Sequence, residues 1–106
     1  EYSYSNAEIF AHAIRTLGRG ILVGTQTAGG VISMGGTRLA DGSYISLPRR
    51  GWWTIDPETG DPLYRLEHNG AMPHIEVDLL PSDIAAGDDP QLEEAVAALM
   101  RLLYPE

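Results

Sequence analysis

A segment with helical periodicity near the start of the chain runs directly into a short apolar stretch, and this order most constrains the fold. Ser5 precedes a segment in which apolar residues recur at helical spacing, and Gly18 and Gly20 can end a helix there. Ile21 to Val23 follows at once, and a short β-branched run between glycines is typical of a buried strand. A helix followed by a buried strand is the second half of a β-α-β unit, so the sequence predicts an α/β fold.

The middle of the chain predicts a β-hairpin. Asp41-Gly42 is a strong two-residue turn signal, because such turns need residues that tolerate positive φ. The flanking stretches Val31 to Ala40 and Ser43 to Leu47 are expected to be the paired strands. Further strands are expected at 52–55, 63–66 and, at a sheet edge, 74–79, with a loop at 56–62.

The end of the chain predicts a second helix. Asp89 is a suitable N-cap, and Pro90 suits the first helical position. An apolar stripe at helical spacing indicates a face that packs in a core or at an interface. The stripe consists of Leu92, Val96, Leu99 and Leu103.

Composition narrows the class of protein. The 106 residues fit one domain or part of one. Seven basic and 15 acidic residues give a net charge of −8, which disfavours a nucleic-acid partner because such partners need a basic face. The absence of cysteine excludes disulfides and thiolate metal sites, and no apolar run approaches the roughly 20 residues of a membrane span. The chain starts at Glu1, and the first strand of the β-α-β unit is expected before it.

Ser5 has two readings from local sequence. It can cap the first helix, with Glu8 three residues later completing a capping box. It can instead be a nucleophile on a strand-to-helix turn, where backbone N–H groups and the helix dipole stabilise a developing oxyanion. Local spacing favours the cap and does not decide between the two.

Longer motifs add a family resemblance. In the C-terminal processing and tricorn serine peptidases, a serine opens a helix written S-x-[AGS]-E-I-F/L, and an apolar strand then leads to a V-G-x-x-T-x-G turn. The stretches Ser5 to Phe10 and Val23 to Gly29 resemble these motifs. Leu66 to Val77 resembles the family's E-N-x-G-x-x-P-D-I-x-V segment, and Asp88 to Glu93 resembles its D-P-Q-L-E closing helix. The resemblance covers nearly the whole chain in order.

The resemblance assigns roles to particular residues. The processing branch uses a lysine base at the position of Gly30, where this chain has none, so the tricorn branch fits better. Ser5 is then implied as nucleophile, and the Asn6 backbone N–H as one oxyanion donor. Glu67 is implied to orient a catalytic histidine through a supporting serine, whereas without the resemblance it is a solvated loop carboxylate. The histidine, the serine and a second oxyanion glycine are expected upstream of this chain.

The histidines present do not match the base position. His12 lies inside the first helix, His68 follows Glu67, and His74 stands where the family has aspartate. None has metal-ligand spacing, so no metal and no cofactor are expected. Asn6 is uncharged where tricorn has an aspartate linked to a preference for basic residues, so that preference is not implied here.

The resemblance implies a fold and a function. The fold is the α/β, crotonase-like (spiral β-β-α) core, with residues 1–106 as the C-terminal part of a serine peptidase catalytic domain. The function is endopeptidase cleavage of peptides or unfolded segments, with this chain inactive alone. Expected partners are peptide substrates, the N-terminal part of the same protein and further copies of it. The rival hypothesis is a non-catalytic peptide-binding or assembly module; an acyl-thioester enzyme lacks support, because it does not need the nucleophile-helix motif.

Overall fold

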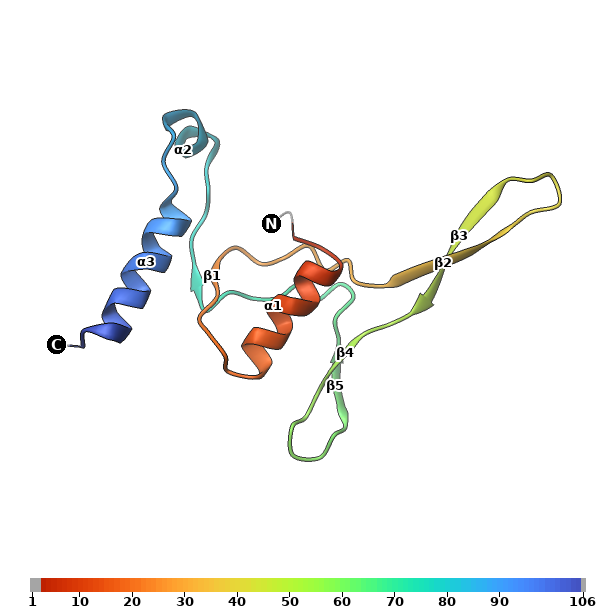
Figure 1. Ribbon diagram of the computed structural model, residues 1–106, viewed down its shortest axis with the longest axis horizontal. Helices are drawn as coiled ribbons and strands as arrows, with labels where there is room; N and C mark the ends of the chain where they lie inside the picture. Colours follow the sequence, from red (N-terminus) through yellow and green to blue (C-terminus); the bar gives the residue numbers. More distant parts are fainter. Residues whose placement is uncertain (1–2, 106) are drawn as a thin grey trace.

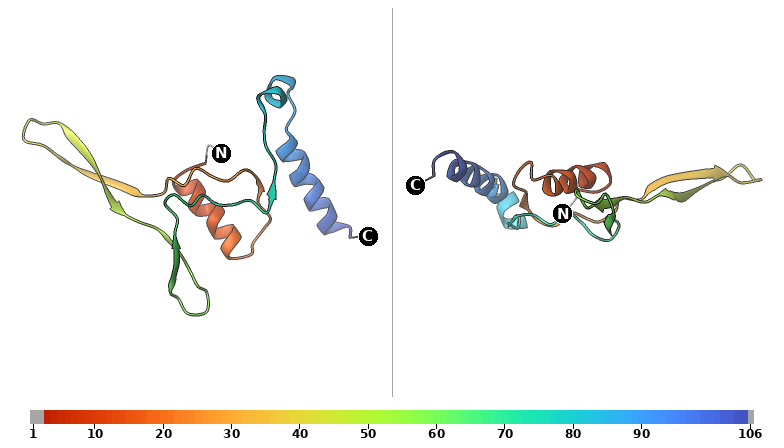
Figure 2. Two further views of the ribbon diagram at one scale, coloured as in Figure 1. Left: turned by 180° about the vertical axis from the view of Figure 1, so that it is seen from behind. Right: turned by 90° about the horizontal axis from the view of Figure 1, so that it is seen from below.

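The computed structural model describes residues 3–105, which form an open layer with two projecting hairpins (Figure 1). The layer measures 66 × 45 × 17 Å, and its thinness is clear in the edge-on view of Figure 2. Its radius of gyration is 18.1 Å, whereas a compact domain of this length has about 13 Å. Few apolar side chains are buried, and among the described residues they are Val31, Leu66, Ala71 and Ala98.

The predicted first helix is present as α1, Asn6–Thr16. Leu17 is its C-cap and Gly18 follows with φ of 58°, as the sequence predicts for a glycine that ends a helix. In Figure 1, α1 crosses the centre of the layer between the hairpins and the C-terminal helix.

The strand after α1 is shorter than predicted. β1, Val23–Gly24, pairs in parallel with β6, Ile75–Glu76. The prediction of a buried strand at 21–23 is wrong in two respects: only Val23 of these residues lies in a strand, and none is buried, with Ile21 43% exposed. The Leu22 N–H, one residue before β1, donates to the His74 Nδ1 atom at 2.9 Å, a contact between residues far apart in the sequence. The edge strand predicted at 74–79 is correspondingly reduced to β6.

The predicted hairpin is confirmed and forms the longer arm in Figure 1. β2, Ser33–Arg38, pairs antiparallel with β3, Tyr44–Arg50. The connection is longer than the predicted two-residue turn: the Leu39 N–H donates to the Ser43 carbonyl, and Gly42 takes the positive φ. β4, Trp53–Ile55, and β5, Pro62–Arg65, form the second hairpin, close to the two strands expected there.

The C-terminal helix is confirmed as α3, Pro90–Leu103, with the Asp89 side chain accepting from the Leu92 N–H at 2.9 Å. It packs on β1. Its apolar stripe stays at least half exposed, and only Ala98 of this helix is buried. A short helix that was not predicted, α2, Pro81–Ala86, precedes it. Within residues 3–105, no helix combines the length and the apolar character that crossing a membrane requires.

Candidate active site

Ser5 stands at the start of α1 in a backbone conformation that side chains rarely adopt. Its φ is 58° and its ψ is −128°, whereas helix N-caps have extended backbone. A non-glycine residue in a sparsely populated region of this kind costs of order 1–3 kcal/mol and persists only where its surroundings hold it. Ser5 is exposed, and its hydroxyl makes no hydrogen bond with the described part of the chain.

The capping box predicted for Ser5 and Glu8 is wrong. The Ser5 hydroxyl caps nothing in α1, so its side chain is not used for helix stability. The Glu8 carboxylate turns away from the helix start toward the loop that follows β1. Ser5 therefore does not act as the side-chain helix cap that local spacing favours.

Glu8 is fully buried and holds that loop. Its Oε1 atom accepts from the Thr27 hydroxyl at 2.5 Å and from the Gly29 N–H at 2.5 Å. Its Oε2 atom accepts from the Gly30 N–H at 2.7 Å. The Gly30 carbonyl in turn accepts from the Ser5 N–H at 2.9 Å, so the loop and the first turn of α1 are tied together.

Glu67 holds the next two residues of the same loop. Its Oε2 atom accepts from the backbone N–H groups of Val31 and Ile32, each at 2.8 Å. The Val31 hydrogen bond, and then the Ile32 one, lower the pKa of the Glu67 carboxyl below its usual value. Its Oε1 atom accepts no hydrogen bond from residues 3–105. Glu67 is therefore ionised at neutral pH and has one oxygen free for a further partner.

Two glycines allow the loop to lie close to the segment after Glu67. Gly29 has φ of 78°, and its carbonyl accepts from the His68 N–H at 2.8 Å. Gly70 approaches the Thr27 carbonyl so closely that a side chain there would collide with it. The chain thus brings residues 5–8, 27–32 and 67–71 into one small cluster.

Asn6 is the first residue of α1, and its side chain is exposed. The first N–H groups of a helix lack an acceptor within the helix and carry positive potential. An oxyanion next to Ser5 would meet that potential.

Two of the three histidines have rings that are hydrogen-bonded to backbone groups away from Ser5, and the third is exposed. His12 is buried in α1, where its Nε2 atom pairs with the Asn69 carbonyl at 2.9 Å. The His74 ring receives the Leu22 N–H, and His68 is exposed with φ of 64°. No hydrogen bond joins any of them to Ser5 within residues 3–105. In the same range, no group of three or more His, Asp or Glu residues is placed to hold a metal ion.

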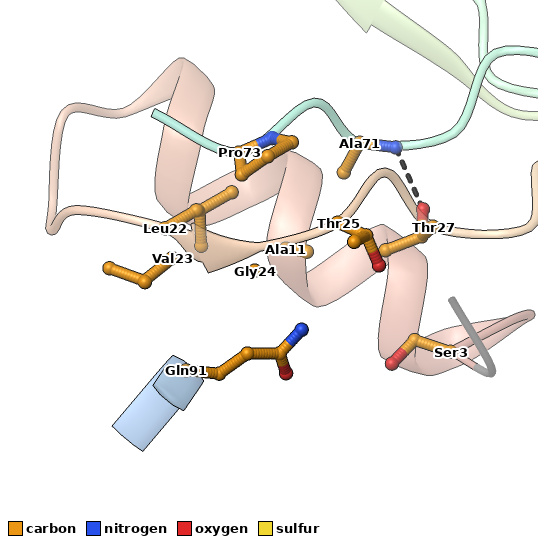
Figure 3. Close-up of a pocket in the computed structure, with 10 residues that line it drawn as sticks. All are labelled: Ser3, Ala11, Leu22, Val23, Gly24, Thr25, Thr27, Ala71, Pro73 and Gln91. Carbon is orange, nitrogen blue, oxygen red and sulfur yellow. Dashed lines mark hydrogen bonds between the residues drawn. The ribbon is translucent and has the colours of Figure 1, made fainter. Parts of the chain in front are cut away.

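A cavity of about 220 Å³ lies beside this cluster, between α1, β1 and the start of α3 (Figure 3). Thr27 lines it, and the figure shows the Thr27 hydroxyl accepting from the Ala71 N–H, at 2.7 Å. The Gln91 amide reaches into it from α3 and also donates to the Val77 carbonyl at 2.8 Å. Ser5 is not among the residues that line this cavity.

Comparison with known proteins identifies the class. The family model for peptidase family S41 matches residues 1–77, well over half of the chain. The chain therefore belongs to peptidase family S41, and the family resemblance carried by the sequence motifs is confirmed.

Within that family, the chain is similar to tricorn proteases. It is 40% identical to Tricorn protease homolog 1 of Streptomyces coelicolor over 97% of this chain and 9% of the relative. It is 36% identical to the Tricorn protease of Thermoplasma acidophilum, again over 97% and 9%. The Putative Tricorn-like protease C-terminal subunit of Sulfurisphaera tokodaii is 36% identical over 97% and 12%.

A solved structure supports the same assignment. The crystal structure of the tricorn protease matches with a TM-score of 0.80 and 36% identity, over 97% of this chain and 10% of that one. The chain therefore has a tricorn-type peptidase fold. It spans about a tenth of the length of these proteins.

Sequence reasoning missed the buried role of Glu8 and the anchoring role of Thr27. Both residues stand in the motifs that carry the resemblance, the S-x-x-E helix start and the T-x-G turn. The signal was therefore present, but a glutamate three residues after a serine also fits a capping box. Only the position of the loop distinguishes the two uses of the same carboxylate.

Proposed function

We propose that this chain carries the nucleophile of a serine endopeptidase of the tricorn type. Ser5 forms an acyl-enzyme with a peptide or an unfolded protein segment, and a histidine from a part of the protein outside this chain acts as base. Residues 1–106 are the C-terminal part of the catalytic domain, with the crotonase-like core completed by the N-terminal part. The relatives are about ten times as long as this chain, which leaves room for such a part.

One observation carries the proposal. Ser5 is held at φ 58° and ψ −128° at a helix N-terminus, with its hydroxyl exposed and without a hydrogen bond to any of residues 3–105. A serine kept only for stability would cap the helix in relaxed backbone, which stabilises by about 1 kcal/mol. A nucleophile on a sharp turn has its hydroxyl exposed and backbone N–H groups nearby.

The proposed chemistry follows from these positions. The Ser5 Oγ atom attacks the scissile carbonyl carbon while the histidine takes the hydroxyl proton. The Asn6 N–H donates to the oxyanion that forms, in the positive potential of the α1 N-terminus. The C–N bond then breaks as the proton passes to the leaving amine, and the acyl group stays on Ser5. Water hydrolyses the ester and restores the hydroxyl.

Glu67 supports the same site from the other side of the loop. The N–H groups of Val31 and Ile32 lower the pKa of the Glu67 carboxyl, so Glu67 is negatively charged at neutral pH. It can therefore accept a hydrogen bond from a partner outside the chain. Its free Oε1 atom is the acceptor we assign to the serine that orients the histidine. Because that serine and the histidine lie outside residues 1–106 in this proposal, the chain alone is expected to be inactive.

The test is labelling with a fluorophosphonate probe, which reacts with activated serines, followed by peptide mass mapping. It is done on the intact protein, meaning the longest natural form that contains this chain, and on residues 1–106. The expected result is labelling of Ser5 in the intact protein only. Ser5→Ala is expected to abolish labelling and peptide hydrolysis, whereas Ser3→Ala, two residues earlier and also exposed, is expected to change neither.

Other outcomes decide between the alternatives. If Ser5 stays unlabelled in a folded intact protein, the enzyme proposal is wrong and the non-catalytic peptide-binding or assembly module takes its place. If residues 1–106 hydrolyse peptides and Ser5→Ala stops this, the base lies inside the chain and the assignment of an outside histidine is wrong.

A further inference from the structure

Four consecutive backbone N–H groups of one loop donate to two carboxylates. Gly29 and Gly30 donate to Glu8, and Val31 and Ile32 donate to Glu67. Successive N–H groups that converge on anions in this way fix the backbone between them. Glu67 already has a role in the proposed function, whereas Glu8 has none.

Glu8 is a costly group to bury. It is fully enclosed, and no cation lies within ion-pair distance of it among residues 3–105. Its charge is offset by three hydrogen bonds and by the N-terminus of α1. An apolar residue here would leave the Thr27 hydroxyl and the Gly29 and Gly30 N–H groups without their acceptor, and an unsatisfied buried polar group costs about 1–3 kcal/mol. Glu8 therefore stabilises the loop and, by the same hydrogen bonds, fixes its backbone atoms.

The fixed atoms lead directly to Ser5. Glu8 holds the Gly30 N–H at 2.7 Å, and the Gly30 carbonyl accepts from the Ser5 N–H at 2.9 Å. The Glu8 N–H returns to the Ser5 carbonyl at 3.1 Å. These contacts close a ring through Ser5, Gly30 and Glu8. The ring contains the Ser5 φ and ψ angles, so it holds the strained backbone from both sides.

We propose that Glu8 is a positioning residue for the Ser5 nucleophile. Its carboxylate holds Gly30, and Gly30 holds the Ser5 backbone so that the hydroxyl stays exposed and aligned. The inference rests on the proposed function, since it needs Ser5 to be the nucleophile. Glu8 lies under the loop and is fully buried, so it does not contact substrate. Its loss is therefore expected to lower kcat and to leave KM unchanged.

Glu8→Gln is the most informative variant. A glutamine has the same shape, but its NH₂ group would face an N–H donor, so one of the loop amides would lose its acceptor. A misplacement of about 1 Å can cost roughly 100-fold in rate. We expect kcat and the rate of Ser5 labelling by fluorophosphonate to fall by about this factor. Glu93→Gln, an exposed first-turn glutamate of α3, is the matched control and is expected to change neither.

The measurements are kcat, KM and the labelling rate of the intact protein, with circular dichroism to establish that each variant is folded. A folded Glu8→Gln with unchanged kcat, or with a change in KM alone, overturns the positioning role. If Glu8→Gln does not fold, Thr27→Val removes one of the three donors and is expected to lower kcat by about 10-fold. A folded Thr27→Val with unchanged kcat overturns the inference as well. Retained activity in Ser5→Ala instead overturns the proposed function.

Discussion

The backbone N–H of Ser5 donates to the carbonyl oxygen of Gly30 at 2.9 Å, across 25 residues of sequence. This bond joins the start of α1 to the loop after β1. Because Glu8 and Glu67 fix that loop on either side of Gly30, the conformation of Ser5 depends on residues far from it in the chain. The strained backbone of Ser5 is therefore maintained by the hydrogen bonds that anchor the loop.

Ser5→Gly is expected to relieve the strain. Positive φ costs a serine of order 1–3 kcal/mol, whereas glycine adopts it freely and pays about 0.5–1 kcal/mol in chain entropy. The net gain of about 1 kcal/mol corresponds to roughly 5-fold more protection of nearby amides. Hydrogen exchange of Glu8 and Ile9, whose N–H groups donate to the Ser5 carbonyl, measures it in the intact protein.

The control for this prediction is Ser3→Gly. Glycine at Ser3 brings the entropy cost and leaves the strained Ser5 backbone as it is. Its protection is expected to fall at the Ala28 N–H, which donates to the Ser3 carbonyl at 3.0 Å. A loss of protection in Ser5→Gly as well would show that the Ser5 backbone is not strained.

Glu67→Gln is expected to weaken the loop in a pH-dependent way. The folded-state pKa of Glu67 lies below 4.5, its usual value, because the carboxylate accepts the N–H groups of Val31 and Ile32. Its contribution to stability is thus complete above the unfolded pKa and is lost as pH falls through the folded pKa. The wild-type advantage in amide protection at these two residues should be largest at neutral pH and shrink on acidification below 4.5. An advantage that stays constant with pH contradicts the prediction.

The regular elements were predictable from the sequence because their signals are local. Asp89 and Pro90 mark the start of α3, and Asp41-Gly42 marks the β2–β3 turn. Each pattern needs only neighbours within a few residues. The short helix α2 was not predicted, because its six residues contain too few turns for apolar periodicity to show.

The site was predictable only in part, for a physical reason. The motifs identify Ser5 and Glu67, but their geometry depends on contacts such as Glu8 with Gly30, 22 residues apart. Strand lengths failed for the same reason, since the His74 side chain takes the Leu22 N–H and shortens the β1 ladder. A pattern over a short window does not encode which distant group will compete for a backbone N–H.

Thr27→Val tests the stability of the loop. The hydroxyl donates to Glu8 at 2.5 Å and accepts from the Ala71 N–H at 2.7 Å, so its removal leaves the Ala71 N–H without an acceptor and the Glu8 carboxylate with one donor fewer. Each unsatisfied buried group costs about 1–3 kcal/mol. Faster amide exchange at Gly29 and Ala71 is the expected result. Thr16→Val, which removes an exposed hydroxyl that bonds to nothing in residues 3–105, should leave exchange at both sites unchanged.

Asp89→Ala tests whether the start of α3 is held by its cap. The Asp89 Oδ1 atom accepts from the Leu92 N–H at 2.9 Å, and removal of such a cap costs about 1 kcal/mol. The apolar face of α3 stays exposed in the described chain, so little packing offsets the loss. Amides in the first turn of α3 are expected to exchange roughly 5-fold faster. Asp88→Ala, whose side chain caps nothing, is the control; equal exchange in both variants would show that the helix start is held by packing rather than by Asp89.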